Sequence, residues 1–310
     1  MRDLGFMREL GAGDFAGPTA RPATDVQARR WQRANRSWWE AHPMRYDFGT
    51  ALPYDDGSAE FYGEIDRRFL QRVRTAFPWT QIPFDNFIDF PSLAGRAVLE
   101  LGTGCGTHAE LLARHAGTYT GIDLTTYAVR MTRRRLDLRR LPGAVLQMDA
   151  EHLSFRDASF DRAWAWGVLH HTADTRRALA ELHRVLRPGG TCTCMVYHRS
   201  LWTTLVRGVV YYGLLRAGFL RTRSVHRLLQ NRSDGALARY YTLDEWRAEL
   251  GGLFAIDRAW ILGDKTQLVP LPHGRPRDLV ARLIPDRVGR TVSSSRPVGN
   301  LLVTALRRID

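Results

Sequence analysis

The stretch Val98-Leu99-Glu100-Leu101-Gly102-Thr103-Gly104-Cys105-Gly106 decides the fold of this 310-residue chain. Its first residues form an apolar run that is typical of a buried strand. The alternating glycines let the backbone turn tightly and approach a ligand without a Cβ atom in the way. Glycine spacing alone also suits a plain turn or a dinucleotide-binding loop. The carboxylate of Glu100, however, is badly placed for a pyrophosphate and well placed for a ligand with an ammonium group.

Short apolar runs alternate with amphipathic stretches beyond this motif. Helices are expected at residues 107–115, 127–138 and 175–186, and a fourth runs from the capping box at Thr242 to Gly251. The expected strands are 97–101, 118–123, 144–148, 160–166, 191–197, 254–262 and 301–306. This alternation predicts a doubly wound, Rossmann-like α/β fold with a seven-stranded, mostly parallel sheet.

Composition divides the chain into three parts. Residues 1–30 lack an apolar period and are expected to form a loose N-terminal arm. Residues 31–91 are rich in aromatic side chains and are expected to form a helical cap, and residues 92–310 form the core. Two insertions interrupt this core: a helical lid at residues 199–241, after the fifth strand, and a Pro- and Arg-rich segment at residues 263–298.

The chain carries a formal net charge of +13, which would ordinarily suggest nucleic acid or an anionic membrane as a partner. Lys265 is its only lysine, however, and arginines occur in every segment. We therefore interpret the charge as compositional and expect no nucleic-acid partner, while a peripheral membrane contact stays open. Arg207 and Arg216 interrupt the longest apolar stretch on both sides of a helix, so we expect no transmembrane span.

The three cysteines show no disulfide framework, and residues 1–10 show no secretory signal. Both features predict a cytoplasmic protein. Cys192 and Cys194 lie on one face of an expected strand, so we interpret them as small core residues and expect no metal site.

Two carboxylates end the strands that follow the glycine motif. Asp123 ends the second strand, where a carboxylate can accept hydrogen bonds from both hydroxyls of a ribose. Asp149 ends the third strand, where it can reach an adenine amino group. One such residue could cap a helix. Two of them beside a glycine-rich switch point favour an adenosine ligand.

The combined pattern resembles the class I S-adenosylmethionine-dependent methyltransferases, in the group that includes ubiquinone/menaquinone and natural-product methyltransferases. The resemblance covers residues 97–197, about a third of the chain. The motifs that carry it, in the family's order, are Glu100–Gly106, Gly121–Asp123, Asp149–Phe155, Ser159–Asp161, Val168–His171 and Leu186–Gly190.

The resemblance implies S-adenosylmethionine as cofactor and S-adenosylhomocysteine as product. It implies that Gly102, Gly104 and Gly106 line the methionine part and that the backbone at Ala165 and Trp166 binds its amine. It implies that Asp123 binds the ribose and that Asp149 and Ala150 bind the adenine. The expected cofactor site is completed by Glu100, Thr103 and Leu124.

His170 and His171 follow the fourth strand, at the expected mouth of the pocket. In some relatives that methylate hydroxyl groups, a histidine here serves as general base. A role in packing or capping is the open alternative. Relatives may pair this base with a carboxylate near the end of the fifth strand, but here Tyr197 or His198 would have to substitute.

We therefore expect methyl transfer to a small, largely apolar acceptor, a specialised metabolite or lipid-like molecule, at a hydroxyl group. The aromatic residues expected to line its pocket, from the cap and the lid, are Trp38, Trp39, Tyr46, Trp202, Tyr211 and Tyr240. The alternatives are a nucleic-acid or protein methyltransferase and an enzyme of this fold that catalyses a reaction other than methylation. The sequence leaves the acceptor and the oligomeric state open.

Overall fold

A central sheet organises the computed structural model, which describes residues 17, 20–47, 51–220, 222–230, 233–269, 271 and 275–310. The strand order is β3-β2-β1-β4-β5-β8-β7, and β6 pairs with β5 off this path. The strands are β1 (Ala97–Leu101), β2 (Thr118–Asp123), β3 (Ala144–Gln147), β4 (Phe160–Trp166), β5 (Leu186–His198), β6 (Tyr240–Tyr241), β7 (Phe254–Leu262) and β8 (Leu301–Arg308).

The pairs β1–β2, β1–β4, β2–β3, β4–β5 and β5–β6 are parallel, and β8 runs antiparallel to both β5 and β7. This mostly parallel sheet confirms the predicted Rossmann-like fold. The chain leaves β1 toward β2 and β3, and later returns to the opposite side of β1 with β4. Ligands bind at such a reversal, beyond the carboxyl ends of the strands.

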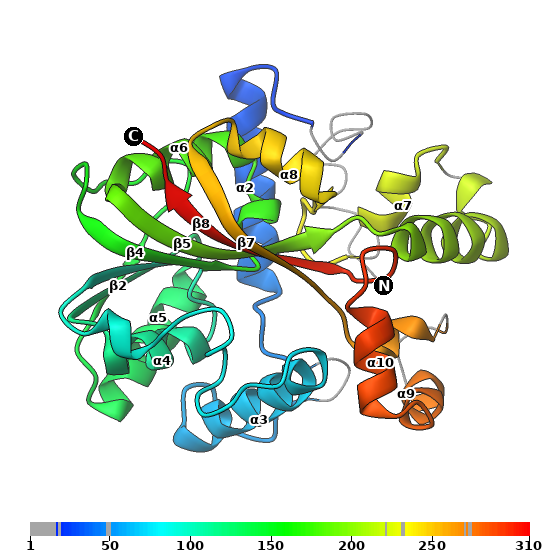
Figure 1. Cartoon of the computed structure of the whole chain (residues 1–310), viewed down its shortest axis with the longest axis horizontal. Helices are drawn as coiled ribbons and strands as arrows, with labels where there is room; N and C mark the ends of the chain where they lie inside the picture. Colours follow the sequence, from blue (N-terminus) through cyan, green and yellow to red (C-terminus); the bar gives the residue numbers. More distant parts are fainter. Residues whose placement is uncertain are drawn as a thin grey trace.

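Helices cover both faces of the sheet, as Figure 1 shows. Strand alternation sends Val98 toward one face, where it packs with Leu112, and Leu99 toward the other, where it packs with Leu182 and Trp246. The first face carries α3 (Ala59–Ala76), α4 (Thr107–His115) and α5 (Thr126–Arg139), and the second carries α6 (Thr175–Val185) and α8 (Leu243–Leu250).

Side-chain caps fix where several helices begin. The hydroxyl of Thr125 accepts a hydrogen bond from the Ala128 amide at the start of α5. Thr242 and Glu245 form the predicted capping box of α8, which ends at Gly251 in a left-handed conformation. Such caps satisfy backbone groups that the helix itself leaves without partners, so these local patterns could be read from the sequence.

Helix α2 (Asp25–Ala41) starts inside the segment that was expected to be a loose arm up to residue 30. The hydroxyl of Thr24 accepts a hydrogen bond from the Gln27 amide, and Asp25 adds a negative charge to the first turn. These two features begin the helix earlier than the aromatic pattern suggested. Most of the predicted arm, residues 1–16 and 18–19, lies outside the described residues.

Strand β5 begins at Leu186, before the expected start at residue 191, because a register shift against β4 after Phe160 accommodates Pro188-Gly189-Gly190 as an irregularity.

The lid that follows β5 is not entirely helical. At its end, Tyr240 pairs with Tyr197 in β6, so Tyr240 lies in a strand. Before β6 lie the π-helical segment η3 (Trp202–Leu215), the short turn η4 (Gly218–Leu220) and α7 (Val225–Gln230).

The Pro- and Arg-rich segment also forms short helices. These are η5 (Lys265–Leu268), α9 (Arg275–Arg282) and α10 (Asp286–Ser293). In the described part of the chain, no helix combines the length and the apolar character that crossing a membrane requires.

Arg135 joins three helices on one side of the sheet. Its side chain projects from α5 and is 1% exposed. The guanidinium donates to Asp66 of α3 at 2.5 Å and to Glu110 of α4 at 2.8 Å. A buried guanidinium is stabilised only when carboxylates satisfy it, so this network ties the cap to the core.

We predict that Arg135→Met lowers the free energy of unfolding by about 3 kcal/mol, because it leaves two carboxylates without their buried partner. Arg139→Met is the matched control, since Arg139 contacts the same Glu110 from an exposed position. This control should cost no more than about 1 kcal/mol. Urea denaturation of both variants gives the comparison, and equal losses would show that the buried network is not what holds the cap.

Candidate functional site

A cavity of about 1460 Å³ opens at the carboxyl ends of the parallel strands. Its walls come from the turn after β1, the ends of β2 and β3, and the segment after β4, and from α2, α3, η3, η5 and α9. Pockets for a single small molecule measure roughly 300–1,000 Å³. This cavity therefore has room for two ligands side by side.

The glycine motif forms the floor of the cavity. Gly102 has a φ of +73°, and a Cβ atom there would lie 2.2 Å from the side chain of Val168. Gly104 has a φ of +55°, and a Cβ atom there would meet nothing within 4 Å. Its backbone therefore faces open cavity space. Gly106 does not line the cavity and turns the chain into α4 with a φ of +81°.

Asp123 holds the ends of two strands together. Its carboxylate accepts hydrogen bonds from the Gly104 amide at 3.1 Å and from the Thr125 amide and hydroxyl at 2.9 and 2.8 Å. Burial raises the pKa of this carboxyl from its ordinary value, although the three donors act against that shift. Asp123 and its neighbour Leu124 both line the cavity. The carboxylate thus stands at the cavity wall in a fixed orientation.

Asp149 stands one strand further along the same edge. Its Oδ1 accepts a hydrogen bond from the Glu151 amide at 2.9 Å and another from the Gln32 side chain at 2.8 Å. Asp149 and Ala150 both line the cavity. Gln32 belongs to α2, so the cap reaches the strand edge here.

Helix α2 lies over this edge through several further contacts. Asn35 donates a hydrogen bond to the carbonyl of His171 at 2.8 Å, and the Trp39 ring packs edge-on against His171 with centroids 5.0 Å apart. Glu40 accepts from the amides of Thr126 and Tyr127 at the first turn of α5. Gln32, Asn35 and Glu40 were not among the predicted site residues. For Gln32 and Asn35 the signal in the sequence was helical spacing, because residues 32, 35 and 39 share one helix face.

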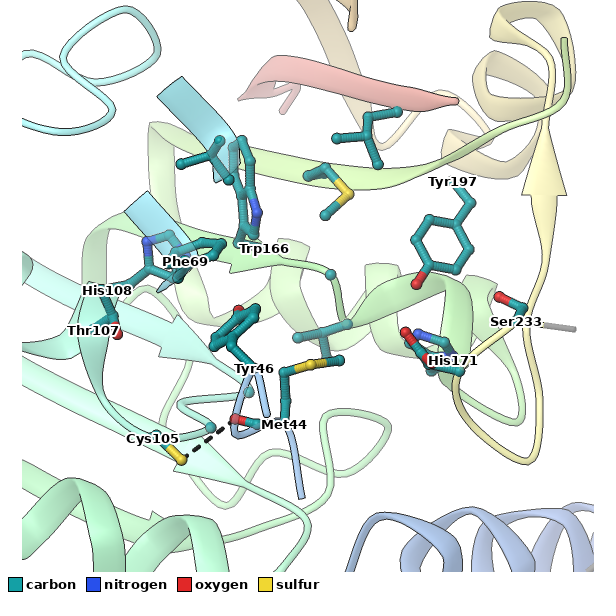
Figure 2. A pocket seen from close by; sticks show the side chains of 18 of the residues that line it. Met44, Tyr46, Phe69, Cys105, Thr107, His108, Trp166, His171, Tyr197 and Ser233 are labelled. Carbon is teal, nitrogen blue, oxygen red and sulfur yellow. Dashed lines mark hydrogen bonds between the residues drawn. The ribbon is translucent and has the colours of Figure 1, made fainter. Parts of the chain in front are cut away.

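His171 lines the cavity, and its ring has a defined tautomer. Its Nδ1 lies 2.5 Å from the carbonyl oxygen of Leu237. A carbonyl oxygen can only accept, so Nδ1 carries a proton and donates it to this hydrogen bond. Tyr197 of β5 lines the same part of the cavity, and Figure 2 shows its hydroxyl and the His171 ring facing this space.

The structure does not bring His170 or His198 to the cavity. His170 has no exposed surface, and its ring centroid lies 4.0 Å from those of both His171 and Tyr197, with the rings tilted. Burial holds the pKa of His170 well below its ordinary value. His198 is buried with Nδ1 2.8 Å from the Gly299 carbonyl, and burial lowers its pKa as well. His170 and His171 are neighbours in a tight turn, and Tyr197 and His198 are neighbours in a strand, so the two members of each pair face different sides. Of these four residues, His171 and Tyr197 face the cavity.

Glu100 and Ala165 also lie behind the cavity wall. Glu100 is completely buried, and its Oε2 accepts a hydrogen bond from the Tyr119 hydroxyl at 2.5 Å. Burial raises the pKa of this carboxyl to about 8. Ala165 is equally buried, whereas the next residue, Trp166, lines the cavity. The predicted cofactor residues that do line it are Gly102, Thr103, Gly104, Asp123, Leu124, Asp149, Ala150 and Trp166.

Three of the six predicted aromatic residues lie in the cavity wall, namely Trp39, Tyr46 and Tyr240. The others do not. Trp38 stacks on His42, Trp202 donates to the Gln267 carbonyl at 2.9 Å, and Tyr211 packs on Tyr212. Apolar wall residues that the sequence analysis missed are Met44, Phe69, Phe77 and Met195. Figure 2 shows Tyr46, Phe69 and Trp166 together on one side of the cavity.

The central part of the chain is similar to known proteins. Residues 99–194 match the family described as a methyltransferase domain. A phthiotriol/phenolphthiotriol dimycocerosates methyltransferase of Mycobacterium tuberculosis is 43% identical over 101 residues, covering 32% of this chain and 36% of that protein. An S-adenosyl-L-methionine-dependent Diels-Alderase, iccD of Talaromyces variabilis, is 28% identical over 173 residues, covering 51% and 54% of the two chains. This chain thus spans about a third to a half of the curated relatives it matches.

Solved structures share the fold over most of the chain. A geranyl diphosphate C-methyltransferase from Streptomyces coelicolor, solved with Mg²⁺, geranyl diphosphate and S-adenosyl-L-homocysteine, aligns with a TM-score of 0.56 at 13% identity. The alignment covers 93% of this chain and 99% of the other. Together with the matched domain, these findings show that the chain carries, in residues 99–194, the domain of the class I S-adenosylmethionine-dependent methyltransferases.

Proposed function

We propose that this protein transfers a methyl group from S-adenosylmethionine to a small, largely apolar acceptor, at a hydroxyl group. The observation that carries the proposal is the pairing of two fixed carboxylates, Asp123 and Asp149, with an open glycine turn at the edge of a cavity too large for one ligand. Relatives named as methyltransferases of lipids support the class of acceptor.

The residues at the strand edge fit the cofactor. Asp123 retains acceptor capacity for ribose hydroxyls beyond the three donors of its own chain. Asp149 and Ala150 suit the adenine, and the missing Cβ atom at Gly104 leaves space for the methionine part. When bound, S-adenosylmethionine supplies an electrophilic methyl group on a sulfonium. The protein supplies alignment and exclusion of water, which account for much of the rate of such a displacement.

His171 is the proposed general base. The carbonyl of Leu237 holds the proton on Nδ1, so Nε2 can take the proton of an acceptor hydroxyl as the oxygen gains the methyl group. Tyr197 would orient that hydroxyl from the neighbouring strand. The proton released by the reaction then resides on His171 until solvent removes it. The helix α2 contacts to His171 support this role because they hold its backbone and ring in place.

Two alternative functions would give different results in the labelling experiment described below. The name of the Diels-Alderase relative supports a reaction without methyl transfer. The positive charge of the chain supports a nucleic-acid or protein acceptor.

Labelling separates these alternatives. Incubating the protein with S-adenosylmethionine labelled in its methyl group and a metabolite extract should place label in a small molecule that organic solvent extracts. Label in nucleic acid or protein would replace the proposed acceptor class. A cofactor that binds without any label transfer, across extracts of different origin, would favour the reaction without methylation.

We predict that Asp123→Ala weakens S-adenosylmethionine binding by about 1.5–3 kcal/mol, since hydrogen bonds to a charged group are lost. Asp137→Ala is the matched control, because Asp137 lies exposed on α5 and away from the cavity. Calorimetry should show unchanged affinity for this control. Because Asp123 also holds the Gly104 turn, circular dichroism must confirm the fold of the variant. Wild-type affinity in folded Asp123→Ala would remove the residue from the site.

We predict that His171→Asn lowers kcat by about 10²–10⁴-fold on the acceptor identified by labelling, while cofactor affinity stays near wild type. His170→Asn is the control from the adjacent position. Because His170 is buried away from the cavity, this variant should lose thermal stability and keep its rate per folded molecule within a few-fold. Normal turnover in His171→Asn, or an equal loss of turnover in both variants, would contradict the assignment of the base.

A further inference from the structure

The part of the cavity farthest from the glycine turn is enclosed by the cap, the lid and the 263–298 segment. Arg72 of α3 lies 3.9 Å from Asp264, which precedes η5. Trp202 of η3 donates a hydrogen bond to the Gln267 carbonyl of η5. These contacts bring together elements that are far apart in the sequence. They define a distal end of the cavity. Segment η5 follows β7, which lies at the opposite end of the strand order from β2 and β3, the strands that carry Asp123 and Asp149 at their ends.

Positive charge gathers at this distal end. Among the described residues that line the cavity, the acidic one there is Asp264, because Asp234 precedes Gly235, which packs against His171. The basic ones are Arg68, Arg72, Arg207, Lys265, Arg277 and Arg282. Lysine and arginine are absent from the described lining near the glycine turn, where Asp123 and Asp149 stand. The two ends of one cavity therefore carry opposite charge.

Ion pairs within the protein account for part of the positive charge. Arg68 donates to Glu64 at 2.7 Å, and Lys265 lies 2.5 Å from Asp286. Arg72 lies near Asp264, as described above. Among the described residues that line this end, basic side chains outnumber acidic ones. Guanidinium groups match the planar geometry of carboxylate and phosphate oxygens.

Aromatic side chains form another part of the cavity wall. They include Tyr46 stacked on Phe69 with ring centroids 4.5 Å apart, and Phe77 packed against Trp166 at 5.6 Å. Apolar walls strengthen the field of nearby charges, because they replace water of high dielectric constant. A ligand that fills the cavity therefore contacts both aromatic rings and arginines.

We propose that the acceptor is an amphipathic anion, with an apolar body against this aromatic wall and a phosphate or carboxylate group bound by the distal arginines, Arg207 among them. This inference rests on the proposed function for the position of the methyl-accepting end. It adds the chemical class of the acceptor group that lies at the distal end of the cavity. Arg207 projects from η3 and Arg277 and Arg282 from α9, so the lid and the 263–298 segment together select the acceptor.

Binding of short amphiphiles tests this proposal without knowledge of the natural acceptor. Octyl phosphate, octanoate and 1-octanol share one alkyl chain and differ in the charge of the head group. Each is titrated by calorimetry into protein saturated with S-adenosylhomocysteine. The anionic probes should bind about tenfold more tightly than octanol, and added salt should reduce that difference. The tighter of the two anions identifies phosphate or carboxylate as the preferred head group.

Two substitutions of arginine by glutamine, one within η3 and one at the residue that follows it, provide the matched comparison. Arg207→Gln should lose about tenfold in affinity for the preferred anion and little for octanol. Arg216→Gln removes the same charge from an exposed position outside the cavity wall and should bind all three probes as wild type does. Should Arg207→Gln fail to fold, Arg282→Gln replaces it in the same comparison, with melting temperatures recorded for every variant.

Equal binding of octanol and the anions would overturn the proposal. So would an equal loss in Arg216→Gln, because the effect would then come from overall charge. Titration of S-adenosylhomocysteine alone is a separate measurement and tests the cofactor site. A protein that binds this nucleoside and shows no preference for anions contradicts only the acceptor class. A protein that fails to bind it contradicts the proposed function, while the amphiphile titrations still report on the distal end.

Discussion

The carboxylate of Asp123 is the constraint on which the site depends. It stands at the end of β2 and accepts hydrogen bonds from the turn after β1 and from the start of α5. The positive φ angles of Gly102 and Gly104 are tolerated because glycine lacks a Cβ atom, and the hydrogen bond from Gly104 to Asp123 fixes the turn. One side chain thereby sets the distance between two parallel strands at the point where a ligand can enter. The cavity floor is therefore held by hydrogen bonds within the protein itself.

Helix α2 connects this floor to the proposed chemistry. The same helix contacts Asp149 through Gln32, the backbone of His171 through Asn35, and the first turn of α5 through Glu40. A movement of α2 would therefore disturb the adenine end and the base together. In the proposed reaction, this helix would also exclude water from the reacting atoms, because it lies across the carboxyl ends of the strands.

Most of the fold could be predicted from local sequence patterns. The direction in which some side chains of the site point could not. Strands such as β4 and the capping box at Thr242 depend on neighbouring residues, so their positions follow from the sequence. His170 and His171 are adjacent and chemically identical, and the turn that carries them, packed against α2 and the lid, decides which one faces the cavity. Gln32 escaped notice because its partner lies 117 residues away. Contacts between distant segments, which define the distal end of the cavity as well, leave little local signal in the sequence.

A crystal structure of the protein with S-adenosylhomocysteine tests the central claim most directly. The account predicts both ribose hydroxyls within hydrogen-bond distance of Asp123 and the adenine beside Asp149. It also predicts that the sulfur faces the space between Trp166 and Tyr197, with the distal end of the cavity still open. Density for the nucleoside elsewhere on the molecule, or a reversed orientation with the adenine toward His171, would contradict this account of the site.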